Sequence, residues 1–216
     1  MPKGFFITLE GIEGCGKTTQ AKLLAEYLKG EGREVVSTRE PGGTAIGKRI
    51  REILLDPKSV GMDRSAELLL YFADRAQHVA QVIEPALTRG AVVICDRFVD
   101  ATAAYQGFGR GLDMDTIADL TEAATRGLTP DLTLLLDLPV EEGLKRARKR
   151  NGDNEQGHEG RFEEEPDEFH EKVRQGYLTI ASCETDRFRI IDASGTVEEI
   201  QRAIRKVIDS DGPGER

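Results

Sequence analysis

Short apolar runs alternate along the chain with segments whose apolar residues recur at helical spacing. The apolar runs predict five strands, over residues 5–9, 34–37, 91–95, 132–136 and 187–191. Most of these runs are continuously apolar, as in parallel strands buried on both faces, whereas 187–191 alternates and is expected nearer an edge. Helical spacing predicts helices over residues 18–28, 65–87, 113–126, 139–150, 168–181 and 197–208. This order predicts a doubly wound α/β domain, a five-stranded parallel sheet with helices on both faces.

One polar segment interrupts this pattern. Five of the six residues from Lys145 to Arg150 are basic, and none of the ten residues at 151–160 is apolar. Because three of those ten are glycines, the segment cannot join a core, and we expect a mobile lid at about 150–162. The rest of the pattern predicts a single domain over residues 1–208, followed by a frayed tail at 209–216.

The composition narrows the class of protein. A length of 216 residues fits one domain, and a formal net charge of −9 argues against general nucleic-acid binding, which needs a basic face. The longest apolar runs hold about five residues, whereas a membrane helix needs about 20. Because residues 1–4 also lead into no signal-peptide pattern, we expect a cytoplasmic protein with no membrane partner.

Cysteine and histidine add no candidate site. The three cysteines lie far apart and show no C-x-x-C spacing, so we expect free thiols rather than disulfides or a zinc site. The three histidines, His78, His158 and His170, are scattered along the chain, and we expect surface or helix roles for them.

The clearest motif is a phosphate-binding loop. Residues 11–18 read GIEGCGKT and fit G-x-x-x-x-G-K-[ST], directly after a predicted strand and at the start of a predicted helix. Backbone N–H groups of such a loop surround phosphate oxygens, so the loop predicts ATP or GTP binding. Lys17 is expected to reach the β- and γ-phosphates as a catalytic residue, and Thr18 to hold magnesium. The predicted ATP-binding residues of this stretch are Gly11, Ile12, Glu13, Gly14, Cys15, Gly16, Lys17, Thr18 and Thr19.

A second acidic element follows the predicted strand at 91–95. Asp96 is expected to help hold the magnesium ion, since a carboxylate at a neighbouring strand end commonly does so in phosphate-loop proteins. Arg97, directly after it, can clamp a phosphate with two parallel hydrogen bonds. A structural ion pair at the strand end is the alternative for these two residues.

Four separated motifs resemble the thymidylate kinase family. Residues 38–44 read TREPGGT, residues 72–75 read FADR, and the phosphate loop begins with GIEG. DRF at 96–98 is followed by AYQG at 104–107. The resemblance extends from residue 5 to about 208. It implies a nucleoside monophosphate kinase fold and the transfer of the γ-phosphate of ATP to dTMP, with magnesium as the cofactor and a homodimer as the assembly.

The same resemblance assigns the nucleotide-binding residues. It implies contacts with dTMP from Glu13, Pro41, Arg51, Tyr71, Arg75, Arg97, Thr102, Tyr105 and Gln106. Tyr71 and Arg75 lie four residues apart in a predicted helix, so one face offers a π surface and a hydrogen-bond donor to the base. The family usually has Phe at the position of Tyr71 and Ser at the position of Ala101. A solvated helix face is the alternative for Arg51. Thr102, Tyr105 and Gln106 are spaced so that they can share one helical face, for which ordinary packing is the alternative.

A catalytic arginine is expected in the polar segment. Members of the family carry it either in the phosphate loop, which here has no arginine, or in the lid. Arg161 stands at the lid position, and Phe162 can anchor it on the apolar body while it swings over the phosphates. A solvated arginine balancing Glu163–Glu165 is the alternative. Arg148, expected near ATP, and Arg150 could share the task.

Other phosphate-loop proteins are less consistent with the sequence. A GTP-binding switch would carry N-K-x-D, which is absent. TREPGGT and AYQG argue against a kinase for another nucleoside or nucleotide. A binding module without catalysis would not need two anion sites flanking one γ-phosphate. Because the dTMP phosphate is already ionised at neutral pH, we expect no general base.

Overall fold

The computed structural model describes residues 4–152 and 160–214 and contains one parallel sheet. Its strands are β1 (Phe5–Glu10), β2 (Val35–Arg39), β3 (Val92–Asp96), β4 (Leu132–Asp137) and β5 (Phe188–Asp192). They are ordered β2-β3-β1-β4-β5, and every neighbouring pair is parallel. The prediction of a five-stranded parallel sheet is confirmed, as is the edge position of the alternating fifth strand. That strand alternates because it is paired and covered less completely than the inner strands.

The helices of the described residues fall close to the predicted ones. They are α1 (Lys17–Gly30), α2 (Ala45–Leu55), α3 (Arg64–His78), α4 (Glu84–Thr88), α5 (Val99–Thr102), α6 (Met114–Thr125), α7 (Val140–Gly152), α8 (Asp167–Cys183) and α9 (Val197–Asp211). A π-helical turn at Val79–Ile83 joins α3 to α4, so the predicted helix over 65–87 is continuous but not uniformly α-helical. A second π-helical stretch, Ala103–Gly109, continues α5. Helix α2, which follows the TREPGGT segment, and helix α5 were not among the predicted helices.

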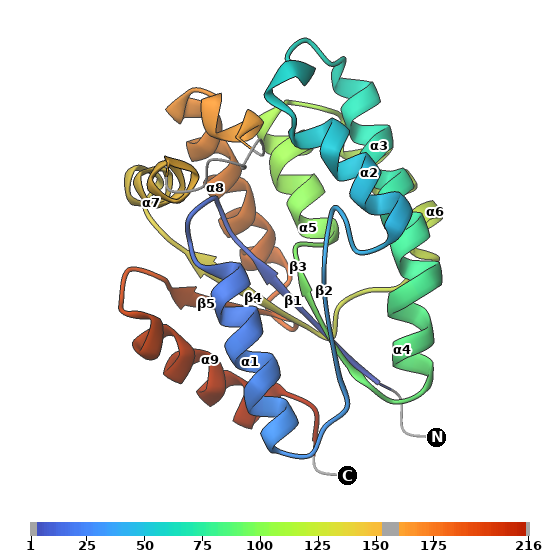
Figure 1. Cartoon of the computed structure of the whole chain (residues 1–216), viewed down its shortest axis with the longest axis vertical. Coiled ribbons are helices and arrows are strands. Elements are labelled where there is room, and N and C mark those ends of the chain that lie inside the picture. The colour runs from blue at the N-terminus through green and yellow to red at the C-terminus, as the bar shows by residue number, and fades with distance from the viewer. Residues whose placement is uncertain (1–3, 153–159, 215–216) are drawn as a thin grey trace.

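Helices cover both faces of the sheet. Figure 1 shows α1 and α9 together on one face, and α8 on the opposite face. On the opposite face, Phe6, Val93 and Cys95 pack against apolar residues of the helical stretch 79–87. Because the inner strands are buried from both sides, most of their residues are apolar.

The predicted tail needs correction, and part of the predicted lid lies outside the described residues. Helix α9 continues to Asp211, and Arg33 Nη2 donates to the carbonyls of Pro213 and Gly214 at 3.0 and 2.5 Å. The expected fraying from residue 209 is therefore wrong for the described part of the tail. Of the predicted lid, residues 153–159 lie outside the described residues. The chain is described again from Gly160 and enters a 3₁₀ turn at Arg161–Glu164.

Candidate active site

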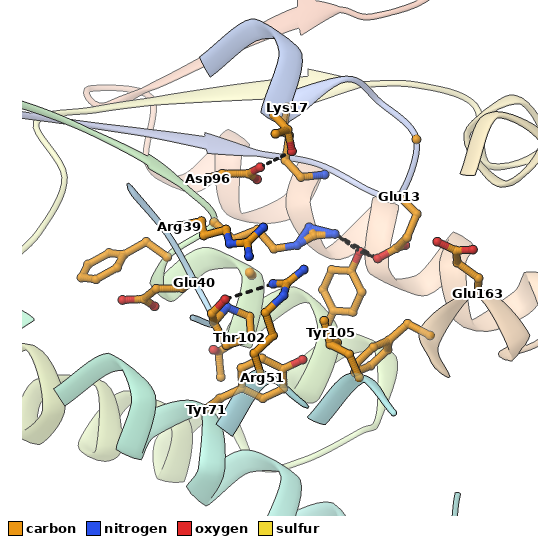
Figure 2. A pocket seen from close by; sticks show the side chains of 18 of the residues that line it. Glu13, Lys17, Arg39, Glu40, Arg51, Tyr71, Asp96, Thr102, Tyr105 and Glu163 are labelled. Carbon is orange, nitrogen blue, oxygen red and sulfur yellow. Dashed lines mark hydrogen bonds and ion pairs between the residues drawn. The ribbon is translucent and has the colours of Figure 1, made fainter. Parts of the chain in front are cut away.

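A pocket of about 710 Å³ opens at the carboxyl ends of β1, β2 and β3 (Figure 2). Loops at this edge of a parallel sheet commonly hold the ligand in α/β proteins. Its lining includes Glu13, Gly14, Gly16, Lys17, Thr18, Thr19, Arg39, Pro41, Arg51, Tyr71, Arg75, Asp96, Arg97, Thr102, Tyr105 and Gln106. The structure therefore brings most of the predicted nucleotide-binding residues, from five separate stretches of chain, into one cavity.

The phosphate loop forms the end of the pocket next to β1. Gly14 has a φ of +71°, and a Cβ atom there would lie 2.0 Å from the carbonyl oxygen of Gly143 at the start of α7. Only glycine allows this approach, which seats the loop against the protein body. Lys17 Nζ donates to the carbonyls of Gly11 and Ile12, at 3.0 and 2.7 Å. Its charge is thereby held inside the loop, where phosphate oxygens would approach.

Two of the predicted ATP-binding residues have side chains in the core. Ile12 and Cys15 are buried in the main core, and neither lines the pocket. Glu13, Lys17, Thr18 and Thr19 do line it.

The predicted magnesium ligands lie together. Thr18 Oγ1 donates to Asp96 Oδ2 at 2.6 Å, joining the start of α1 to the end of β3 (Figure 2). Both residues line the pocket beside Lys17. A hydroxyl and a carboxylate are hard oxygen donors, the type that Mg²⁺ prefers alongside substrate phosphates. The donor set therefore fits a magnesium ion that also contacts a nucleotide.

Arg97 lies between the phosphate loop and the rest of the pocket. Its Nη2 donates to Glu13 Oε1 at 2.9 Å and to the Tyr105 hydroxyl at 3.0 Å, and Nη1 lies 3.4 Å from the Gly11 carbonyl. Its backbone has a φ of +69°, in the left-handed region that residues with a side chain seldom adopt. Such strain is typical of functional sites, where the surrounding structure holds one residue in a required direction.

Glu13 anchors this arrangement as a charged carboxylate. Burial raises the pKa of Glu13, but the contact with His170 and the positive charges of Arg97 and Lys17 outweigh burial and hold it well below its ordinary value. His170 Nδ1 lies 3.3 Å from Glu13 Oε2, and the Tyr105 hydroxyl donates to Oε1 at 2.5 Å. Glu13 therefore remains ionised throughout the neutral range and fixes the direction of Arg97.

The far end of the pocket has the features of a base-binding site. Tyr71 lines it with its ring, and burial raises the pKa of the Tyr71 hydroxyl, which stays protonated. Thr102 Oγ1 and Arg75 Nη1 are buried and have no hydrogen-bond partner among the described residues. Since buried polar groups are normally paired, these two atoms are positioned for a polar ligand. Gln106 also lines the pocket, and its amide nitrogen donates to Glu67 at 2.8 Å.

The structure does not bring Arg161 to the phosphate loop. Its Nε donates to the Leu54 carbonyl at 2.6 Å and its Nη2 to Glu67 Oε2 at 2.7 Å, with the side chain 7% exposed. The expected anchoring of Phe162 is found, because its ring packs edge-on against Tyr105 with centroids 5.5 Å apart. Anchoring therefore places Arg161 against α3 rather than above the phosphates.

Arg148, expected near ATP, also lies away from the phosphate loop. Its guanidinium is 61% exposed and lies 3.9 Å from Asp167, outside the pocket lining. Arg146, two residues earlier on α7, lines the pocket instead and donates to the Ala193 carbonyl at 3.1 Å. Residues two apart on a helix point in nearly opposite directions, so helical phase could have selected Arg146 from the basic run.

Sequence reasoning missed three further residues of the site. Arg39 ends β2 beside Asp96 and lines the pocket without having been assigned a role. His170 and His78 were expected to have surface or helix roles. Both lie in helices, but both are buried beside acidic residues, so the surface role is wrong. Neither histidine carries a local signal, since the partners of His170 and His78 are Glu13 and Glu40, far away in sequence.

Comparison with known proteins identifies the family. The model of the family described as thymidylate kinase matches residues 9–204. The chain belongs to the thymidylate kinase family. A thymidylate kinase of Geotalea daltonii is 56% identical over 206 residues, covering 95% of this chain and 96% of that protein. One from Geobacter sulfurreducens is 54% identical, with 95% and 96% covered.

A solved structure supports the same assignment. The crystal structure of thymidylate kinase from Ehrlichia chaffeensis aligns with a TM-score of 0.78 and 35% identity, covering 96% of this chain and 100% of that one. The expected family, its enzyme class and the nucleoside monophosphate kinase fold are thereby confirmed. Within residues 4–152 and 160–214, no helix combines the length and the apolar content needed to cross a bilayer.

Proposed function

We propose that the pocket transfers the γ-phosphoryl group of ATP to dTMP and releases dTDP and ADP. The observation that carries this proposal is the placement of Arg97, whose guanidinium lies between the phosphate loop and the residues suited to a base. ATP would bind with its phosphates in the loop at Lys17, and dTMP would bind with its base beside Tyr71. The two phosphates would then meet at Arg97, as an in-line transfer requires.

The chain's own residues supply alignment and positive charge. Lys17, Arg97 and Arg39 surround the place where the phosphates meet, and three cations can offset the charge that develops during transfer. Arg97 is held in place by the hydrogen bonds that its Nη2 donates to Glu13 and to the Tyr105 hydroxyl. Since the acceptor phosphate is already ionised at neutral pH, no side chain has to remove a proton.

Thr18 and Asp96 would hold the magnesium ion, which neutralises phosphate charge when it is bound. Both side chains lie beside Lys17, so a magnesium ion held by them and the Lys17 ammonium group could contact the same phosphate group. The cytoplasm is the proposed location, because ATP and the other nucleotides of this reaction are found there.

Base selection is the sharpest test of the proposed substrate. The wild-type protein is expected to form ADP from ATP with dTMP, and far less with AMP, UMP or dCMP. Arg75→Lys keeps a positive charge beside Glu40 but removes the Nη1 donor, so the KM for dTMP should rise about 10- to 100-fold, the effect of losing one hydrogen bond to a charged group. The KM for ATP should stay near its wild-type value. Equal weakening of both substrates in steady-state assays would contradict the assignment of Arg75 to the base.

We propose a homodimer that forms through helices α2 and α3. Ile46 and Ile53 of α2 are 52% and 49% exposed, Leu69 of α3 is 55% exposed, and the two helices pack side by side. Exposed apolar side chains that gather on adjacent helices are typical of a protein interface.

Leu69→Glu should therefore convert a dimer into a monomer at micromolar concentration in sedimentation velocity. Ile190→Glu, at a 54% exposed position on the edge strand β5, provides the matched control and should leave the dimer intact. A wild-type monomer, or equal effects of the two substitutions, would reject this interface.

A further inference from the structure

Arg75 lines the pocket, and two of its three guanidinium nitrogens are already bound. Nε donates to Glu40 Oε2 at 2.8 Å, and Nη2 donates to the Phe98 carbonyl at 2.9 Å. The side chain is 1% exposed, and Nη1 has no hydrogen-bond partner among the described residues. The direction of Nη1 is thus set by the position of the Glu40 carboxylate.

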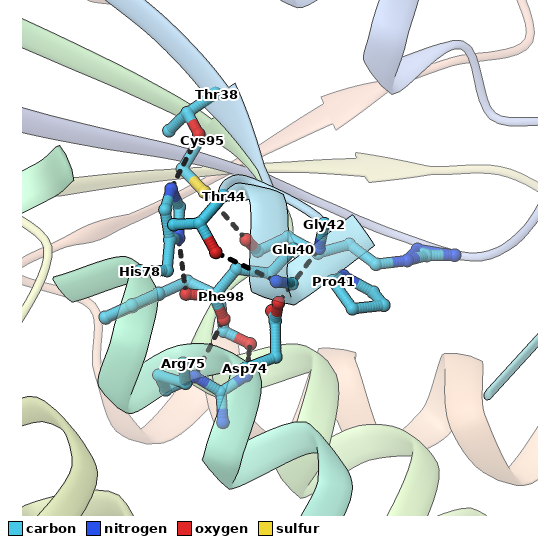
Figure 3. Close-up of polar contacts among 12 residues, drawn as sticks. Thr38, Glu40, Pro41, Gly42, Thr44, Asp74, Arg75, His78, Cys95 and Phe98 are labelled. Atoms are coloured by element: carbon cyan, nitrogen blue, oxygen red, sulfur yellow. Dashed lines mark hydrogen bonds and ion pairs between the residues drawn. The ribbon is translucent and has the colours of Figure 1, made fainter. Parts of the chain in front are cut away.

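That carboxylate is itself held on its other side by His78. His78 Nδ1 lies 2.8 Å from Glu40 Oε1, and Nε2 lies 2.6 Å from Thr38 Oγ1 (Figure 3). The ring is 0% exposed, so water cannot replace either contact. Both ring nitrogens are satisfied when Nδ1–H donates to the carboxylate and Nε2 accepts from the threonine hydroxyl.

The elements involved explain why this arrangement is rigid. Thr38 and Glu40 belong to the segment at the end of β2, whereas Arg75 and His78 lie three residues apart on one face of α3. The carboxylate is therefore clamped between two side chains of a single helix turn. A Cβ atom on Gly43 would lie 2.4 Å from the imidazole, so the backbone after Pro41 packs directly on the ring.

A neighbouring carboxylate completes the cluster. Asp74 Oδ1 accepts from the Gly42 N–H at 3.1 Å, and burial, together with the nearby charge of Glu40, raises the pKa of Asp74 to about 6. Glu40 faces Arg75 and His78 directly, whereas Asp74 holds the loop. The group that orients Arg75 is therefore the pair formed by Glu40 and His78.

We infer that His78 is a positioning residue for recognition of the base, acting through Glu40 on Arg75. The inference rests on the proposed contact between Arg75 and the base of dTMP. His78 does not line the pocket, so it would act on the substrate only through another residue. Its function is to keep the carboxylate from rotating, so that Nη1 of Arg75 stays directed into the cavity. Fixing this group before binding avoids an entropic cost on binding.

Two substitutions of His78 separate this role from simple packing. An asparagine amide nitrogen can occupy the place of Nδ1 and still donate to Glu40, whereas a glutamine amide nitrogen reaches the place of Nε2 and lies nearer Thr38. Both variants lose the ring, so both are expected to lower the unfolding temperature. His78→Gln should raise the KM for dTMP about tenfold, with the KM for ATP and kcat near wild type. His78→Asn should recover most of that loss.

The measurements are steady-state KM values for both substrates and thermal unfolding of each variant. Equal dTMP KM values in the two variants, or a parallel rise in both substrates, would overturn the inference. So would an unchanged dTMP KM in His78→Gln.

Combining His78→Gln with Arg75→Lys tests the route of the effect. If His78 acts through Arg75, the glutamine substitution should add little in the Arg75→Lys background. Full additivity would overturn the inference, because His78 would then act by another route. If Arg75→Lys alone leaves the dTMP KM unchanged, the proposed base contact fails, and the inference fails with it. If Arg75→Lys raises the dTMP KM as expected but His78→Gln does not, the inference about His78 is overturned and the proposed base contact of Arg75 stands.

Discussion

Replacing Arg97 by alanine is expected to lower kcat by about 10³-fold, the lower end of what a guanidinium contributes to phosphoryl transfer. The side chain is held by Glu13 and Tyr105 at 2.9 and 3.0 Å, so its charge is fixed before substrates bind. Arg97→Lys should recover little, because a single ammonium group cannot reproduce two parallel hydrogen bonds to a phosphate. Steady-state kcat and KM values for ATP and dTMP provide the measurement.

A matched control is available at Arg89. It forms an ion pair with Glu34 at 2.7 Å, is 49% exposed, and stays outside the pocket lining. Arg89→Ala should leave kcat within about twofold, since exposed pairs contribute little. Retention of kcat within tenfold in Arg97→Ala would show that the guanidinium is not needed in the transition state.

The sequence predicts the fold because the decisive signals are local. Continuous apolar runs identify strands buried on both faces, and the glycine-lysine-threonine spacing of the phosphate loop needs only eight consecutive residues. Helix α2 does carry a local signal, because Ile46, Ile50, Ile53 and Leu54 recur at helical spacing, although Ile46 and Ile53 of that stripe are exposed. The tail was expected to fray from 209 because its contacts, such as that of Asp209 with Tyr27, come from a distant helix.

The site was predictable where a short motif carries the chemistry, and less so where long-range pairs do. The spacing of Tyr71 and Arg75 predicts that they share a helix face, and the family resemblance assigns that face to the base. His78 and His170 have no such spacing, since each binds a carboxylate from another part of the chain. A lone buried histidine looks the same in sequence as an exposed one.

Arg161 illustrates the same limit most clearly. Its sequence neighbours are acidic, which favoured either a free catalytic arginine or a solvated one. In the structure its partner is Glu67, on helix α3 and 94 positions away. The hydrogen bond from Gln106 and the charges of Arg110 and Arg161 outweigh burial and keep the pKa of Glu67 below its ordinary value. Glu67 is therefore a buried, ionised carboxylate whose charge is offset by Arg110 and Arg161.

Arg161→Ala is consequently expected to destabilise the protein by about 1–3 kcal/mol, the cost of removing one partner from a buried acceptor, because Glu67 keeps Arg110 and Gln106. Because Glu67 also accepts from Gln106 in the pocket, the KM for dTMP should rise while kcat stays within a few-fold of wild type. Chemical denaturation and steady-state kinetics together provide the measurement. A catalytic arginine would give the opposite pattern, with kcat falling by about 10³-fold and stability nearly unchanged.

The double variant Arg161→Ala with Glu67→Gln decides between the two roles. Removing the carboxylate charge removes the reason for the destabilisation, so the double variant should regain much of the lost stability, and the two effects should not add. Arg110, 3.4 Å from Glu67, and Gln106 remain in place to pack around the neutral amide. If kcat falls by three orders of magnitude in both variants while Tm barely moves, Arg161 leaves Glu67 during turnover and contacts the phosphates. The observed pair would then be the resting position of a catalytic group.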